Sequence, residues 1–256
     1  MEVININSDQ KIVLDTQANE IEININNCRA IITDISNGVK KINVNDGSLD
    51  YCYIKKDTND IVTNVNVTSG NADVKVIDIL NNTSKNNYSL NLLDEGSEIN
   101  FSVASVARVN ANKDYKIDSV NDARYSNVKI DCFGISENES CIKYDITSYI
   151  KKGAKQSVVN QSSKILLFDK ESKGINNPIL EIEENDVKAN HGSSIGMIDE
   201  ETLFYLTSRG IEEKDARNLV SIGRINYLIN EVKDEKIKED LLKEVLERVW
   251  VYERLS

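Results

Sequence analysis

The stretch from Ala189 to Gly210, ANHGSSIGMIDEETLFYLTSRG, marks the boundary between two kinds of sequence in this chain. Before it, short alternating runs predict strands along almost the whole length. After it, apolar residues recur at helical spacing. The stretch also contains His191, the only histidine of the chain. Any chemistry that requires an imidazole therefore takes place near this boundary.

Residues 2–182 repeat a short run of alternating apolar and polar residues that ends in Asn, Asp, Gly or Ser. Examples are Ile21–Ile25, Tyr88–Leu92 and Ile99–Val103. A period of two in β-branched residues, with turn residues between the runs, predicts β-strands. No long helical period interrupts the series, which excludes an alternating βαβ plan. We therefore predict a mainly β protein with a β core over 1–196 and a helical domain over 197–256.

The arrangement of the strands is less directly encoded. Asn-rich corners, short strands at fairly even spacing and few aromatic residues favour a β-solenoid, in which each coil buries its inward side chains against the next. A sandwich or jelly roll would give similar short strands, and no repeat of fixed length is visible. Pro178, the single proline, is expected at the start of a strand, where a missing N–H costs least.

Composition limits the functional classes. The chain has 256 residues, with 42 acidic against 31 basic side chains and a formal charge of −11. This balance argues against a nucleic-acid partner, which requires clustered Lys and Arg. The first residues lack the features of a signal peptide, and no apolar run reaches the roughly 20 residues that span a bilayer. We expect a cytoplasmic protein with no membrane contact.

Four cysteines, at 28, 52, 132 and 141, lie far apart with no C-x-x-C pair. This spacing fits neither a disulfide framework nor a self-contained zinc site, so most are expected to be reduced strand residues. Cys132 and Cys141 flank a predicted turn over 134–140. If they face each other on adjacent strands, their two thiols are candidate metal ligands.

The tail predicts three helices. Asp199 is placed as an N-cap ahead of two glutamates, and Gly210 is a typical C-terminal stop. A second helix is predicted from one apolar face, formed by Ala216, Leu219, Val220, Gly223 and Tyr227. A third starts near Asp234, and its apolar face is formed by Ile237, Leu241, Val245 and Val249. These helices are expected to seal the open end of the solenoid, because an uncapped coil invites aggregation.

Several motifs in the second half of the chain occur together in one known family. They are Lys151–Ala154 (KKGA), Ser162–Leu167 (SSKILL), Pro178–Ile182 (PILEI), Asp186–Gly192 (DVKANHG), Gly196–Glu201 (GMIDEE), Leu203–Leu206 (LFYL) and Ser208–Ile211 (SRGI). Through them the segment 114–255 resembles the SufB/SufD family of the SUF system, which assembles iron–sulfur clusters. Because the chain starts directly in strands, it is similar to a short SufD-like form without the family's N-terminal helical region.

The resemblance implies a right-handed parallel β-helix with a C-terminal helical domain. It implies a scaffold rather than an enzyme. The implied partners are a SufC-like ABC ATPase, docked on the helical domain, and a second SufB/SufD-type protomer in a homodimer or heterodimer. A transient iron–sulfur cluster is the implied cargo, with no cofactor tightly bound to the isolated chain.

The implied cluster site centres on His191, which matches the family's histidine and is a candidate metal ligand. Glu183 or Glu184 could lie near it on the preceding strand, with Cys132 and Cys141 as further candidates, since thiolate, imidazole and carboxylate groups bind such metals. Two family cysteine positions hold other residues here, Ser163 and Ala189. Direct sulfur acceptance by this chain is therefore not expected.

The resemblance also implies an ATPase contact on the helical domain. Its candidate residues are Phe204, Tyr205, Arg209, Gly210, Arg217, Leu219 and Gly223. Two other classes compete with the scaffold interpretation. One is a purely structural or interaction solenoid without cluster chemistry. The other is a polysaccharide-active β-helix, for which the chain lacks aromatic platforms. No P-loop motif occurs, so ATP hydrolysis would be the work of a partner.

Overall fold

The computed structural model describes residues 1–56 and 60–250, with the side chains of 214, 218, 221, 222, 224 and 246–250 excepted. The strands are β1 (Glu2–Ile6), β2 (Gln10–Leu14), β3 (Glu20–Asn26), β4 (Arg29–Asp34), β5 (Val39–Ile54), β6 (Ile61–Asp78), β7 (Ser84–Leu92), β8 (Glu98–Ala107), β9 (Asn112–Asn121), β10 (Asn127–Ser136), β11 (Cys141–Ile150), β12 (Val158–Leu167), β13 (Lys173–Ile182) and β14 (Lys188–Met197). The helices are α1 (Glu200–Ser208), α2 (Glu213–Asn230) and α3 (Glu235–Trp250).

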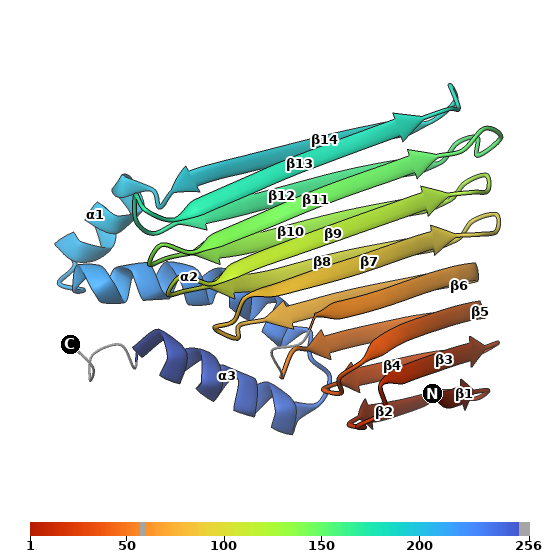
Figure 1. The fold of residues 1–256 in the computed structure, drawn as a ribbon, viewed down its shortest axis with the longest axis horizontal. Helices are drawn as coiled ribbons and strands as arrows, with labels where there is room; N and C mark the ends of the chain where they lie inside the picture. The colour runs from red at the N-terminus through yellow and green to blue at the C-terminus, as the bar shows by residue number, and fades with distance from the viewer. Residues whose placement is uncertain (57–59, 251–256) are drawn as a thin grey trace.

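The strands wind into a flattened parallel solenoid with two facing sheets (Figure 1). One sheet runs β13-β11-β9-β7 and the other β8-β10-β12-β14, and both join at the long strand β6. Strands β5 and β6 each pass from one sheet into the other, so that β5 pairs with β3 in one half and with β4 in the other. The predicted mainly β solenoid with C-terminal helices is confirmed.

The coils lengthen along the chain. Asparagines in register on successive coils are 19 residues apart at Asn24 and Asn43, 23 at Asn43 and Asn66, and 25 at Asn66 and Asn91. Further on, the registered pair Asp145 and Asn177 is 32 residues apart. The solenoid therefore widens from its N-terminal to its C-terminal end, which is why the sequence shows no repeat of fixed length.

The inward faces of the two sheets form one continuous apolar core. Each strand contributes alternate residues to it, as in β3, where Ile21, Ile23 and Ile25 are buried while their neighbours are not. Isoleucine, valine and leucine supply most of this core. The β-branched side chains of isoleucine and valine suit the pleated surface, and burial of apolar area at roughly 25 cal/mol per Å² stabilises the stack.

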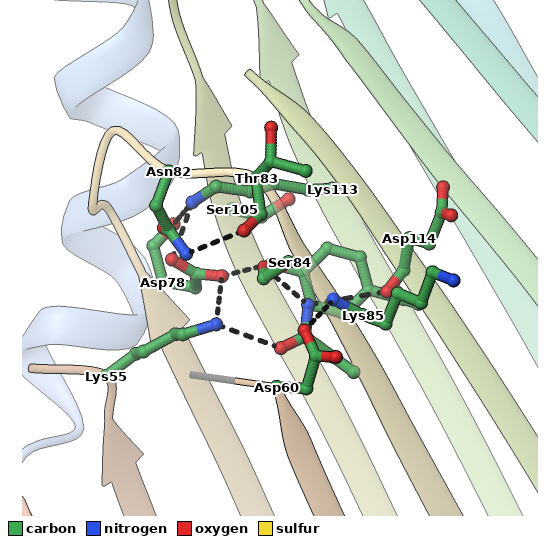
Figure 2. A network of polar contacts seen from close by, with 12 residues as sticks. Lys55, Asp60, Asp78, Asn82, Thr83, Ser84, Lys85, Ser105, Lys113 and Asp114 are labelled. Atoms are coloured by element: carbon green, nitrogen blue, oxygen red, sulfur yellow. Dashed lines mark hydrogen bonds and ion pairs between the residues drawn. The ribbon is translucent and has the colours of Figure 1, made fainter. Parts of the chain in front are cut away.

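A charged network is enclosed within this core. Asp78 accepts hydrogen bonds from Tyr115 Oη (2.7 Å) and Lys113 Nζ (2.5 Å), and Lys55 Nζ lies 4.0 Å from the same carboxylate. All three charged side chains are fully buried. Lys55 also donates to the Asn86 amide oxygen at 3.2 Å. Figure 2 shows Lys55, Asp78 and Lys113 converging from different coils, so the network links the strands inside the solenoid.

The helices lie along the flank of the solenoid, and the expectation that they seal its open end is wrong. Ile225, Ile229 and Leu241 pack on the outer surface of the β6–β8–β10 sheet, against Ile77 and Val106. Figure 1 shows α2 and α3 beside the strand ends of that sheet, while β13 and β14 remain uncovered. The outward residues near these strand ends are apolar, and this apolar strip draws the helices to the flank.

The helix ends follow the sequence more closely than the helix faces do. Asp199 caps α1 through hydrogen bonds from the backbone N–H of Glu201 and Thr202, and Gly210 follows the helix with φ of 86°. The predicted apolar face of α2 is wrong in part. Ala216 is buried, but Leu219 and Tyr227 are exposed, and among the α2 side chains that the structure describes the other buried ones are Ile225, Leu228 and Ile229. In α3, the predicted Leu241 and Val245 are buried, whereas the side chain of Val249 lies outside the described residues.

Candidate functional site

The last coil, β13 and β14, ends the solenoid without a further strand. Each of these strands pairs on one side only among the described residues, β13 with β11 and β14 with β12. Five large apolar side chains of this coil are exposed: Ile175, Ile179, Ile182, Ile195 and Met197. Pro178 lies in the middle of β13, not at its start as predicted, and an edge strand tolerates it because its missing N–H leaves no ladder bond broken.

His191 lies on β14 in register with Gln161 of β12, whose side chain is buried in the interior. Side chains in register on parallel strands point to the same face, so the imidazole faces the interior at the open end of the solenoid. No coil covers it, and it is exposed. Ser193 follows on the same face, in register with the buried Ser163. The His191 imidazole is therefore exposed to solvent, and the buried side chains of Gln161 and Ser163 form a polar layer on the neighbouring strand.

That polar layer has unused hydrogen-bonding capacity. Gln161 donates through Nε2 to Ser148 Oγ at 2.7 Å and to Ile179 O at 3.0 Å. Within the described part of the chain, its Oε1 atom, the Ser163 hydroxyl and the Asn176 Oδ1 atom have no hydrogen-bond partner. A buried unpaired polar atom costs free energy, which accounts for the rarity of such atoms in interiors. Gln161 lies in register with His191, whereas Ser163 is in register with Ser193 and Asn176 donates to Ser194 O, so the three unpaired atoms follow β14 along the end of the solenoid.

The two glutamates predicted near His191 are engaged elsewhere. Glu184 accepts backbone hydrogen bonds from Gly153 (3.1 Å) and Asn185 (2.9 Å) in the turn after β13, and these hold the pKa of its carboxyl below the usual range. Glu183 is exposed, and a hydrogen bond with its carboxylate raises the pKa of Tyr149 on the outer face. The structure therefore does not bring either carboxylate together with the imidazole.

The candidate pairing of Cys132 with Cys141 is wrong. β10 and β11 belong to opposite sheets, and the turn between them starts after Ser136 rather than at Gly134. Cys132 points into the core, where burial raises the pKa of its thiol. Cys141 is half-buried at the start of β11, and burial raises its thiol pKa as well. A raised pKa disfavours the thiolate that a metal would require.

The chain by itself provides no complete metal centre in its described part, where no group of three or more His, Cys, Asp or Glu side chains comes together. On the face that His191 shares, its register partner on β12 is the amide side chain of Gln161, and the Ser193 hydroxyl follows along β14. These are weak ligands for the soft metals that thiolates select. The open end can therefore contribute an imidazole to a site completed by other molecules.

The helical candidates are placed differently from one another. Phe204 and Tyr205 of α1 are exposed, the former at 74%, and so are Leu219, Gly223 and Tyr227 of α2. Arg209 lies over the Tyr205 ring at 5.3 Å. Arg217 is used internally: it donates to Phe168 O at 3.2 Å and to Glu213 at 2.7 Å, which ties α2 to the solenoid. Tyr227 was missed as a surface residue because its spacing fits the predicted apolar face.

A separate groove runs between α2 and the outer face of the β8–β10 sheet. It is lined by Lys75, Lys129, Lys164, Asp73, Asp131, Glu231 and Tyr227, among others. Two of these lysines are already paired with carboxylates, Lys75 with Asp50 and Lys129 with Asp131, both at 2.8 Å. Its balanced charges favour neither an anion nor a cation.

No helix in the described part of the chain is long and apolar enough to cross a membrane. Comparison with known proteins identifies the solenoid. The family model described as "SUF system FeS cluster assembly, SufBD core domain" matches residues 8–224.

Individual relatives match shorter segments. The iron–sulfur cluster assembly protein SufD of Bacillus subtilis is 35% identical over 115 residues, which is 45% of this chain and 26% of the relative. SufD of Escherichia coli is 37% identical over 84 residues, 33% of this chain and 20% of the relative. A SufBD family protein of Mycobacterium leprae is 38% identical over 80 residues, covering 31% of this chain and 20% of the relative. The matches thus span about a fifth to a quarter of the relatives' length. Because the family model covers most of the sequence and the fold is the parallel solenoid described above, the chain belongs to the SufBD family of SUF iron–sulfur cluster assembly proteins.

Proposed function

We propose that this chain is a scaffold subunit of a SUF-type iron–sulfur cluster assembly complex, in which the open end of the solenoid contributes His191 to the place where the cluster is built. The observation that carries the proposal is the position of His191. It is the only imidazole of the chain, and it faces the interior at the C-terminal end of the solenoid, where unpaired polar atoms of Gln161, Ser163 and Asn176 and exposed apolar side chains of the last coil are found.

The scaffold role is non-enzymatic. Burial raises the pKa of the thiols of Cys52, Cys132 and Cys141, which disfavours a reactive thiolate at these three positions. Thiolates and sulfide for the cluster would come from a second protomer and a sulfur donor, with iron and sulfur as cargo. Ser163, at a cysteine position of SufB-like proteins, is a buried hydroxyl and provides no persulfide-forming sulfur. The chain would therefore hold and position a cluster rather than accept sulfur.

The second protomer would pair with the uncovered edges of β13 and β14. Free strand edges and exposed Ile and Met side chains are the features that native proteins cover by pairing. A protomer seated here would bury the exposed apolar residues of the last coil. It would also bring its own ligands to the side of the solenoid that His191 faces.

A SufC-like ABC ATPase would dock on the exposed surface of α1 and α2. The supporting observation is the pair of exposed aromatic residues, Phe204 at 74% and Tyr227 at 70%, on helices whose other faces pack on the solenoid. Aromatic side chains are enriched in the energetically dominant parts of interfaces. Arg209 and Tyr205 lie together beside Phe204 and would extend the same contact.

Co-purification tests the ATPase contact. The chain and the SufC-type ATPase of the same organism would be co-expressed, and the ATPase retained by a tag on this chain would be quantified. Phe204→Glu is expected to reduce the retained ATPase, because a charge in the centre of an interface cannot be desolvated cheaply. The control is Leu93→Glu, which changes an exposed apolar residue directly after β7, and Figure 1 shows that β7 ends on the side of the solenoid away from the helices. No retention of the ATPase by the wild-type chain would contradict this part of the proposal.

A purely structural solenoid is the second candidate. The feature that favours it is the outer asparagine ladder, Asn5–Asn24–Asn43–Asn66–Asn91, in which each amide donates to the one on the preceding coil at 2.7–3.0 Å. This ladder stabilises the solenoid without any part in cluster chemistry. If the chain binds neither the ATPase nor a second protomer, that result would favour the purely structural solenoid over the scaffold role.

A further inference from the structure

We propose that Gln161 of β12 is the positioning residue of His191. Its side-chain carbonyl oxygen, Oε1, accepts a hydrogen bond from the N–H of the imidazole, which fixes the tautomer of the ring and leaves the other ring nitrogen free for a metal. The inference rests on the proposed function and deepens it, because it names the group that decides which ring nitrogen is offered. Two observations carry it, the register of β12 with β14 and one unpaired buried atom.

The orientation of the Gln161 amide follows from its hydrogen bonds. One end of the amide lies 3.0 Å from Ile179 O and 2.7 Å from Ser148 Oγ. A backbone carbonyl only accepts hydrogen bonds, so the end that faces Ile179 O must be the NH₂ group. The carbonyl end of the amide, Oε1, therefore lies on the side away from Ile179 O.

A row of buried hydroxyl groups holds the amide in this orientation. Ser119 Oγ donates to Ser148 Oγ at 2.6 Å, and the same Ser148 oxygen accepts the hydrogen bond from Gln161 Nε2. All three side chains are buried. If the amide turned over, its carbonyl would face Ile179 O, and both bonds of the NH₂ group would be lost. Oε1 is thus held in place from inside the solenoid.

His191 carries the donor that Oε1 lacks. The oxygen is buried and has no hydrogen-bond partner in the described part of the chain. Gln161 stands between two register partners in its sheet, Ile130 of β10 and His191 of β14. Ile130 is apolar and cannot donate, whereas a neutral imidazole has one N–H. Ser163, the next inward residue of β12, has a hydroxyl that is itself unpaired, so it does not satisfy Oε1.

The two side chains are close enough to form this bond. Neighbouring strands of a sheet are about 4.8 Å apart, and side chains in register point to the same face. His191 is exposed, and no coil of the described chain is stacked on it, so its ring can turn about χ1 and χ2 toward Oε1. The bond removes the penalty of an unpaired buried acceptor, which favours it over a ring turned to solvent.

A hydrogen bond at one ring nitrogen decides the chemistry of the other. Neutral imidazole has one N–H and one lone pair, and a metal binds through the lone pair. Histidines that bind metals usually donate their second ring nitrogen to an oxygen acceptor, which fixes the tautomer and the ring orientation. Gln161 lies on the preceding coil, on the inner side of His191. The nitrogen that remains free is therefore directed to the open end of the solenoid.

Nitrogen NMR of the full chain tests this pairing. Because His191 is the only histidine, labelling with ¹⁵N-histidine gives one pair of ring-nitrogen signals, whose shifts report the ratio of the two tautomers at an alkaline pH where the ring is neutral. The wild-type chain is expected to hold one tautomer in excess. Gln161→Met keeps the length of the side chain but removes the acceptor, and it is expected to shift the ratio roughly fivefold toward that of a free histidine peptide.

Ser163→Ala is the matched control. It also removes an unpaired buried polar group from the inward face of β12, but its register partner is Ser193. It is expected to leave the tautomer ratio of His191 at the wild-type value. The same ratio in the wild-type and Gln161→Met chains would overturn the inference.

A measurement on the wild-type chain keeps the test independent of how well the variant folds. Nuclear Overhauser contacts are expected between the ring protons of His191 and the side-chain NH₂ protons of Gln161, together with slowed exchange of the ring N–H proton with water. A ring that shows neither the contacts nor the slowed exchange would overturn the pairing.

Iron and sulfide loading of the complex separates the inference from the proposed function. If His191→Ala lowers the loading while the tautomer ratio does not depend on Gln161, the inference is overturned and the proposed function stands. If the tautomer ratio depends on Gln161 while the His191→Ala complex loads iron and sulfide normally, the pairing is supported and the proposed function is contradicted.

Discussion

Asp78 and Tyr115 are hydrogen-bonded inside the solenoid, with 2.7 Å between the Asp78 Oδ2 and Tyr115 Oη atoms, although they come from coils 37 residues apart. The same carboxylate balances Lys55 and Lys113, and none of the three charges reaches solvent. Asp78 is therefore the anion on which the buried network depends.

Asp78→Asn is expected to destabilise the fold by about 3–5 kcal/mol, because it leaves buried ammonium groups without their carboxylate. Urea unfolding followed by circular dichroism measures the change. Asp118→Asn is the matched control. Asp118 pairs with Lys116 at 3.2 Å on the exposed outer face, where loss of an ion pair costs about 0–1 kcal/mol. Similar losses for both variants would show that burial of the network contributes nothing.

Gly70 allows the close contact between β5 and β6 at the corner where both strands change sheet. It has φ of +104°, and a Cβ there would overlap the backbone of Gly47. Gly70→Ala is expected to prevent the corner from closing and to cost more than about 3 kcal/mol, since strain and overlap add.

Gly96→Ala is the matched control for this corner. Gly96 also has a positive φ, of +75°, but a Cβ there meets nothing within 4 Å, so only the backbone strain of about 1–2 kcal/mol applies. The difference between the two variants in thermal unfolding isolates the steric term. Equal destabilisation would mean that the contact with Gly47 is not tight in solution.

Glu184 gives a pH-dependent prediction. The pKa of its carboxyl is lowered by the backbone hydrogen bond from Gly153, so the folded chain binds the proton less tightly than the unfolded chain. Its contribution to stability is therefore present above the ordinary pKa of a glutamate, about 4.3, and is lost as the pH falls through the lower folded value.

Glu184→Gln is accordingly expected to lower the melting temperature at pH 7 and to have a smaller effect at acid pH, where the wild-type carboxyl is protonated. Glu239→Gln, on an exposed position of α3, is the control and is expected to change neither value. A Glu184→Gln effect that stays constant between pH 7 and acid pH would contradict the ionic role of this side chain.

The strands and the first helix cap were predictable because they depend on local pattern. Alternation such as IEINI at 21–25 predicts a strand with one buried face, and Asp199 ahead of two glutamates has the chemistry of an N-cap. The solenoid itself needed the family motifs, because coils that lengthen from 19 to 32 residues conceal the repeat.

The buried network and the helix positions could not be predicted. Lys55 and Lys113 occur among polar residues typical of surface strands, and only the stacking of coils shows that they point inward. The helices pack on the flank because an apolar strip formed by residues such as Ile77 and Val106 lies there. That strip comes from separate coils, so it is invisible along the sequence.

The candidate site was predicted in part for the same reason. The position of His191 at the final coil follows from its place just before the helices. Gln161, Ser163 and Asn176 were not linked to it, because their proximity depends on register between strands. The cysteines were misplaced because consecutive strands of a solenoid belong to opposite sheets.

The most direct test of the cluster-scaffold role is anaerobic assembly of iron and sulfide on the complex of this chain with the SufC-type ATPase and a second SufBD protomer. His191→Ala is expected to keep the circular dichroism spectrum and the complex intact, since the side chain is exposed, while the iron and acid-labile sulfide bound per complex fall. Ser193→Ala, on the same face of β14, serves as the control. Equal iron and sulfide in the His191→Ala and wild-type complexes would contradict the account.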